Sequence, residues 1–154
     1  MRLQEILTEA TIQVESGEVD KWTVIDRLVD SLATSNAEVD GSAVHTAVLD
    51  REHQGSTGLE HGIAVPHARC EGLPGVMAAL AISRDGIDFE SADGQPCHLV
   101  FLIVAPPGES ANYLQLLSEV ATIGENPERI SRLRQAAAAQ DALAILGESP
   151  QELV

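Results

Sequence analysis

The apolar residues recur along the chain with a period that predicts two helices in its first third. Between Lys21 and Ser35 they are spaced three and four positions apart, as on one face of an amphipathic helix. Asp20 precedes this segment and is a suitable N-cap, because its side chain can accept a hydrogen bond from the first helical N–H groups. Asp40 predicts the start of a second helix that runs to about His53.

The last third of the chain also has helical spacing. Apolar positions predict a helix over residues 112–123, and Asn126 followed by Pro127 is typical of a helix start. A further helix is expected from Ala136 to Leu146, where Gly147 ends it. The helices therefore lie on either side of a central apolar region.

Strands are predicted in that central region. Val76–Ser83 and His98–Val104 are continuous apolar runs of strand length, typical of strands buried on both faces. The turn-rich segment between them is expected to hold a short edge strand near Ile87 and Phe89, and a weak alternation around Ile12 predicts a first strand. Doubly covered strands with helices before and after them predict an α/β sandwich, although the strand order cannot be read from the pattern.

Composition restricts the class of protein. The chain has 154 residues, 44% of them hydrophobic, which suits a single domain over residues 1–154 with a loose tail from about residue 146. No apolar run approaches the roughly 18 residues of a membrane span, and the start does not resemble a secretory signal, so we expect a cytoplasmic protein without membrane insertion. The net charge of −15 excludes nucleic acid as a partner, because it leaves no basic face.

The segment REHQGSTGLEHGIAVPHAR, residues 51–69, brings together the candidate chemistry. His67 follows Pro66, which cannot donate a hydrogen bond to a neighbouring strand, so pairing should stop there and leave the imidazole free to face a groove. An unprotonated ring nitrogen in that position can attack phosphorus.

Positive charge is expected beside this histidine. Arg51 follows Ala47 and Val48 at helical spacing, so it should lie on the buried stripe at the last turn, where a guanidinium requires an anion. Arg69 lies two residues after His67 and adds a second positive charge. The loop formed by Gly55, Ser56, Thr57 and Gly58 could present its backbone N–H groups to phosphate oxygens, although it lacks the Lys of a P-loop.

Plainer interpretations fit each residue taken alone. His67 could be an ordinary structural histidine, Arg51 a solvated helix residue, and the glycines simple turn residues. His53, His61 and His67 do not have the spacing of a common zinc site, and the acidic residues of the 88–93 loop do not match a calcium loop. We therefore expect no metal site.

The stretch GSTGLEHGIAVPHAR, followed later by IDFESADGQPCHLVFLIVAPPGES, resembles the enzyme IIA proteins of the phosphoenolpyruvate-dependent sugar phosphotransferase system. The similarity is to the fructose–mannitol type, and within it to the nitrogen-regulatory IIA proteins. It implies a three-layer α/β/α sandwich around a mixed sheet, and neither a metal nor an organic cofactor. It also implies that His67 accepts phosphate from a histidine phosphocarrier protein, with Arg51 neutralising the phosphate and the 55–58 loop lying at the same groove.

Two positions depart from that pattern. Ala68 stands where the family usually has glycine after the histidine, which is tolerable unless the backbone requires a positive φ. Tyr113 stands where many members have a second histidine; it could donate to a phosphate oxygen or simply pack at the edge of the core.

Two functions are consistent with this resemblance. The chain could relay phosphate as part of sugar transport, through a downstream IIB domain. Alternatively, it could be a regulatory module, without a role in sugar transport, that binds a kinase or transporter according to its phosphorylation state, as the nitrogen-regulatory proteins suggest.

Overall fold

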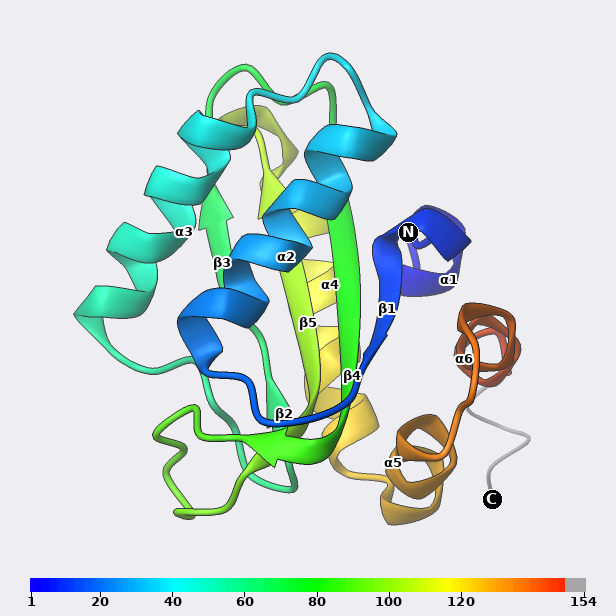
Figure 1. Cartoon of the computed structure of the whole chain (residues 1–154). Coiled ribbons are helices and arrows are strands. Elements are labelled where there is room, and N and C mark those ends of the chain that lie inside the picture. Colours follow the sequence, from blue (N-terminus) through cyan, green and yellow to red (C-terminus); the bar gives the residue numbers. More distant parts are fainter. Residues whose placement is uncertain (149–154) are drawn as a thin grey trace.

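A five-stranded sheet lies between two layers of helices in the computed structural model, which describes residues 1–148 (Figure 1). The strand order is β1–β4–β5–β2. β3 also pairs with β5, further along that strand than β2 does. β4 and β5 are antiparallel, whereas the other pairs are parallel, so the sheet is mixed. The strands are β1 (Ile12–Glu15), β2 (Ile63–Ala64), β3 (His67–Arg69), β4 (Met77–Ile87) and β5 (Cys97–Ala105).

The helices divide between the two faces of the sheet, with α2 and α3 in front of it in Figure 1 and α4 behind it. Each face has its own apolar cluster, because β4 and β5 send alternate side chains to opposite sides. This arrangement confirms the three-layer α/β/α sandwich. The helices are α1 (Leu3–Ile6), α2 (Lys21–Ser35), α3 (Gly41–Gln54), α4 (Ser110–Gly124), α5 (Pro127–Arg134) and α6 (Ala139–Leu146), with short 3₁₀ turns η1 (Glu9–Thr11) and η2 (Pro107–Glu109).

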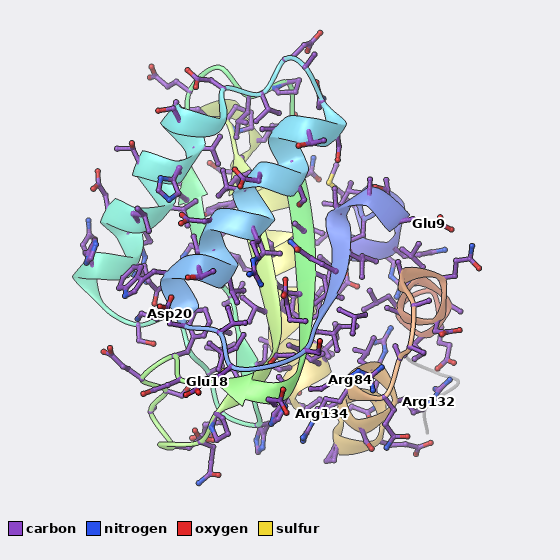
Figure 2. All side chains as sticks on the ribbon, in the orientation of Figure 1. Glu9, Glu18, Asp20, Arg84, Arg132 and Arg134 are labelled. Carbon is purple, nitrogen blue, oxygen red and sulfur yellow. The ribbon has the colours of Figure 1, made fainter. Side chains whose placement is uncertain are left out.

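The predicted helix starts are confirmed. The side chains of Asp20, Asp40 and Asn126 each accept a hydrogen bond from a backbone N–H three residues later, and Asp20 lies at the foot of α2 in Figure 2. The predicted start of α6 at Ala136 is three residues early. The N–H of Ala136 still donates to the carbonyl of Leu133, so this part of the chain completes the end of α5.

The predicted edge strand near Ile87 and Phe89 is wrong. Ile87 belongs to β4 and pairs with Cys97 after an irregularity in the ladder. Gly86 makes this bend, since its φ of +88° is one that a side chain disfavours. Phe89 lies outside the strands and is fully buried.

Arginines hold the two ends of the described chain together. Arg2 and the buried Arg129 both donate to the carbonyl of Leu146, which lies at the negative end of α6. Arg132 forms a bidentate ion pair with Glu148. Of the tail predicted to be loose, residues 149–154 lie outside the described part of the chain.

Candidate functional site

β3 places His67 and Arg69 on one face of the sheet. Successive side chains of a strand point to opposite faces, and Ala68 between them packs into the apolar cluster beneath α2 and α3. His67 and Arg69 therefore point toward the side of α4. Ala68 has the extended backbone of a strand, so the methyl group in place of glycine causes no strain here.

Pro66 interrupts the sheet edge, but the interruption is shorter than predicted. β2 ends at Ala64, and the ladder to β5 resumes at His67, which pairs with Ile103. The expectation that His67 leaves the sheet is thus wrong for its backbone. The imidazole reaches the surface because β3 is at the edge, not because pairing has stopped.

An open pocket of about 490 Å³ lies at this edge of the sheet. The candidate side chains of Arg51, His67, Arg69 and Tyr113 all line it. Its wall is formed by residues from α3, β3 and α4. Two leucines of α4 complete the rim, and one of them, Leu114, is 58% exposed. The lining is Ala47, Asp50, Arg51, Gln54, His67, Ala68, Arg69, Tyr113, Leu114 and Leu117.

The tautomer of His67 follows from its one backbone contact. Nδ1 lies 2.7 Å from the carbonyl oxygen of Val65. A carbonyl can only accept, so Nδ1 carries the proton and Nε2 carries the lone pair. Among residues 1–148, no group forms a hydrogen bond with Nε2. The ring is therefore oriented as a nucleophile with its reactive nitrogen uncommitted.

Electrostatics keep this ring neutral. Burial lowers the pKa of His67 below its ordinary value of 6.5, and the Arg51 guanidinium lowers it further. The Val65 hydrogen bond and the Glu52 carboxylate act in the opposite direction, but burial and Arg51 prevail. The unprotonated form is consequently the main form at neutral pH.

Arg51 reaches the pocket but is not on the buried stripe of α3, which corrects its predicted placement. That stripe is Val44, Val48 and Glu52, which follow one another at intervals of four residues. Arg51 is half-buried beside the stripe, and its Nη1 donates to the carbonyl of Gly55. No carboxylate of the described chain is within salt-bridge distance of Arg51.

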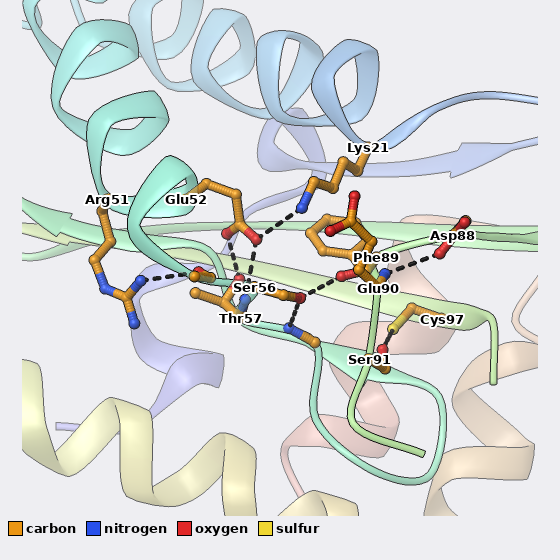
Figure 3. A network of polar contacts seen from close by, with 12 residues as sticks. Lys21, Arg51, Glu52, Ser56, Thr57, Asp88, Phe89, Glu90, Ser91 and Cys97 are labelled. Atoms are coloured by element: carbon orange, nitrogen blue, oxygen red, sulfur yellow. Dashed lines mark hydrogen bonds and ion pairs between the residues drawn. The ribbon is translucent and has the colours of Figure 1, made fainter. Parts of the chain in front are cut away.

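Glu52 is a buried charged residue next to the site that the sequence did not single out. Its carboxylate is 1% exposed and accepts from Lys21 Nζ at 3.2 Å and from both the N–H and the hydroxyl of Thr57 (Figure 3). A buried carboxylate requires such partners. The available signal was its spacing of four residues from Val48.

The 55–58 loop does not present a row of free N–H groups to the pocket, as had been expected. The N–H groups of Gly55, Thr57 and Gly58 donate to Glu52 O, Glu52 Oε2 and Ser56 Oγ (Figure 3). None of these four loop residues lines the pocket. The loop instead fixes the end of α3, from which Arg51 extends.

Tyr113 lies beside His67, with 6.0 Å between the ring centroids. The guanidinium of Arg69 lies 5.3 Å from the centre of the Tyr113 ring, a cation–π arrangement. Burial raises the pKa of Tyr113, although Arg69 and Arg51 oppose the change. The hydroxyl therefore stays protonated and can donate a hydrogen bond.

A stacked pair adjoins the buried ion pair. The rings of Trp22 and His53 are 4.5 Å apart and almost parallel, and Lys21 Nζ lies 4.7 Å from the centre of the tryptophan ring. Trp22 thus connects the start of α2 with the end of α3.

Comparison with known proteins identifies the family of this chain. Residues 5–149 match the family "Phosphoenolpyruvate-dependent sugar phosphotransferase system, EIIA 2". The chain belongs to this family. The predicted family is confirmed, as is the mixed sheet that it implied.

The relatives of this IIA protein include sugar-specific and nitrogen-regulatory proteins. The fructose-specific EIIABC component of Bacillus subtilis is 41% identical over 80% of this chain, which spans 19% of that relative's length. A nitrogen regulatory protein of Pseudomonas aeruginosa is 30% identical over 91% of both chains. The nitrogen regulatory protein IIA-Ntr of Neisseria meningitidis has a similar structure, with a TM-score of 0.83, 29% identity, and coverage of 94% of this chain and 98% of that one.

Three further features of this IIA protein concern membrane spans, metal ligands and cysteines. No helix in residues 1–148 is long and apolar enough to cross a membrane. The same residues contain no group of three or more potential metal-ligating side chains. Cys70 and Cys97 are both buried and free, and burial raises the pKa of each thiol.

Proposed function

We propose that this IIA protein accepts a phosphoryl group on Nε2 of His67 from a histidine phosphocarrier protein. The observation that carries this proposal is the hydrogen bond from Nδ1 to the carbonyl of Val65, which leaves the Nε2 lone pair in a pocket with Arg51 and Arg69. Within residues 1–148 no carboxylate lies within salt-bridge distance of Arg51, so this guanidinium is available for an incoming anion.

The transfer step balances without another reactant. The Nε2 lone pair of His67 attacks phosphorus, and the donor's N–P bond breaks with its electron pair returning to the donor nitrogen. The proton on Nδ1 stays in place, because Val65 continues to accept it. Arg51 and Arg69 offset the charge of the phosphoryl oxygens, and Tyr113 can donate to one of them.

The next recipient is a IIB domain or a regulated target protein. A IIB domain fits the fructose-specific relative, which is named as an EIIABC component. A regulatory signal fits the relative named as a nitrogen regulatory protein. In both cases we place the protein in the cytoplasm, where the phosphocarrier would meet it.

Labelling tests the acceptor. The purified protein, incubated with phosphoenolpyruvate, enzyme I and the phosphocarrier, should acquire acid-labile, base-stable phosphate. His67→Ala should remain unlabelled, whereas His98→Ala, which removes a histidine outside the pocket, should label as the unchanged protein does. Full labelling of His67→Ala would reject the assignment.

A second candidate function is a binding module that phosphate switches on or off. The exposed Leu114 beside Leu117 at the pocket rim favours it, because an apolar contact at this rim would feel the charge of a phosphoryl group on His67. Affinity for candidate kinases and transporters should then differ between the phosphorylated and unphosphorylated forms. Equal affinity of every partner for both forms would reject this function.

A further inference from the structure

A second cationic pocket lies at the opposite end of β5 from His67. His67 pairs with Ile103, five residues after His98, which corresponds to about 17 Å along the strand. The pocket near His98 has a volume of about 420 Å³ and opens between β4 and α5. Its lining residues are Ser83, Arg84, Ser131, Arg134 and Gln135.

Two arginines form its walls and face no acid within the described residues. Neither Arg84 nor Arg134 has a carboxylate within salt-bridge distance, although the chain carries 24 acidic and only 9 basic residues. Both lie at the foot of the molecule in Figure 2. Asp85, the neighbour of Arg84, accepts a hydrogen bond from the N–H of Gly17 and does not line the pocket. The pocket is therefore cationic on a strongly acidic protein.

Arg134 is held in place by a histidine of fixed tautomer. His98 Nδ1 lies 2.9 Å from the carbonyl of Ser83, so Nδ1 carries the proton. Its Nε2 then accepts from Arg134 Nη2 at 3.2 Å. A Cβ at Gly86 would lie 3.2 Å from the imidazole, so close packing fixes the ring. This contact uses one of five guanidinium N–H groups and leaves the others for a ligand.

Ser83 borders this pocket, but its hydroxyl does not face it. Its register partner Glu15 bonds Arg27 of α2, and paired side chains share a face, so the Ser83 side chain lies on the α2 side of the sheet. The Ser83 carbonyl already accepts from His98 Nδ1, so the two arginines are the groups that an anion would meet.

A second, less polar pocket adjoins this one. It has a volume of about 410 Å³ and shares Ser131 and Arg134 with the first; Pro96, Pro127 and Ile130 supply its apolar surface, and Asp93 also lines it. We propose that these adjacent pockets bind a small molecule with a carboxylate or phosphate group. The oxyanion lies between Arg84 and Arg134, and the uncharged body of the ligand lies against the apolar surface.

Four probes test the proposal: inorganic phosphate, phenyl phosphate, acetate and benzoate. Comparing phosphates with carboxylates shows which anionic group is preferred, and comparing each phenyl compound with its small counterpart shows whether an apolar body adds affinity. Each is titrated into the full chain while the ring signals of His98 are followed by NMR. We expect saturable shifts, with the phenyl member of the preferred pair binding several-fold more tightly than its small counterpart. Failure of all four to give a saturable shift, or equal shifts with sodium chloride, would overturn the proposal.

Charge-matched variants locate the site. Arg84→Gln and Arg134→Gln should each weaken binding about tenfold, the typical consequence of losing one charge-assisted hydrogen bond. Arg132→Gln removes the same charge from α5 outside both pockets and should change the affinity less than about twofold. Equal weakening by all three would show general attraction and reject the site. Arg51→Gln should leave the His98 shifts unchanged, which separates this site from the His67 pocket.

Discussion

His67 and His98 lie on neighbouring strands and share one tautomer, yet their surroundings differ. In both, Nδ1 donates to a backbone carbonyl, that of Val65 or of Ser83. Nε2 of His98 is occupied by Arg134, whereas no described residue bonds Nε2 of His67. The tautomer alone therefore does not distinguish the two histidines. The difference is that a guanidinium bonds the lone pair of His98 Nε2, whereas Arg51 lines the pocket of His67 without bonding its Nε2.

The largest expected effect concerns the buried ion pair between Lys21 and Glu52, next to Arg51 of the His67 pocket. Among the described residues, the pocket beside His98 has no such pair. Glu52→Gln leaves the ammonium of Lys21 buried without a counterion, which should cost about 3–5 kcal/mol of unfolding free energy. Urea unfolding measures this loss. Glu60→Gln, an exposed change on the following loop, is the matched control and should have almost no effect. A loss below about 1 kcal/mol for Glu52→Gln would show that the ion pair is not needed.

A second experiment compares the two arginines directly. Arg51→Gln should slow phosphoryl acceptance by about 100-fold, because a positioned donor to the transferred group is lost. Arg134→Gln removes the same charge from the other site and should leave the rate unchanged. Rapid-quench labelling with the phosphorylated carrier gives both rates. Similar slowing in the two variants would mean that only overall charge matters.

The His98 ring packs against Gly86, where an added methyl group would disturb the contact. Gly86→Ala introduces a side chain at a φ of +88°, and its Cβ would lie 2.9 Å from that of Pro96. We expect a loss of about 1–3 kcal/mol in thermal or urea unfolding, from backbone strain and overpacking. Labelling of His67 should remain intact once the variant is folded. An unchanged stability would show that the His98 end tolerates rearrangement.

The smallest effect is on the titration of His67. Its pKa should be below 6.5 in an NMR titration, and Arg51→Gln should raise it, because one of the two lowering causes is gone while burial remains. The folded ring binds a proton less readily than the unfolded one. The folded state should therefore lose stability as the pH falls from above 6.5 through the lowered pKa. His67→Ala should lack this component, and a titration midpoint above 6.5 would contradict the prediction.

Local signals explain why the helices were predictable. Asp20, Asp40 and Asn126 stand directly before apolar periodicity and satisfy N–H groups three residues away, so the information lies within one turn. His67, Arg51 and Arg69 come from one short motif in the same way, and the structure brings all three into one pocket. Strand order, in contrast, depends on hydrogen bonds between distant segments, as where His67 pairs with Ile103.

Buried polar contacts were the main failure of prediction. Glutamate is usually exposed, and the burial of Glu52 is favourable only because Lys21 and Thr57 bond its carboxylate. The Glu52 carboxylate also occupies the N–H of Thr57, one of the loop groups that were expected to bind phosphate. Ile87 was assigned to a separate strand because its pairing with Cys97 follows a bend that turn residues alone do not specify.

The stacking of Trp22 on His53 has a practical consequence for following the protein in solution. Trp22 is the chain's single tryptophan, so intrinsic fluorescence comes essentially from one place. That indole stacks on the last turn of α3, from which Arg51 extends, so its emission depends on the packing of this turn. The chain thus carries its own optical reporter for the end of α3, which can be followed without attaching a dye.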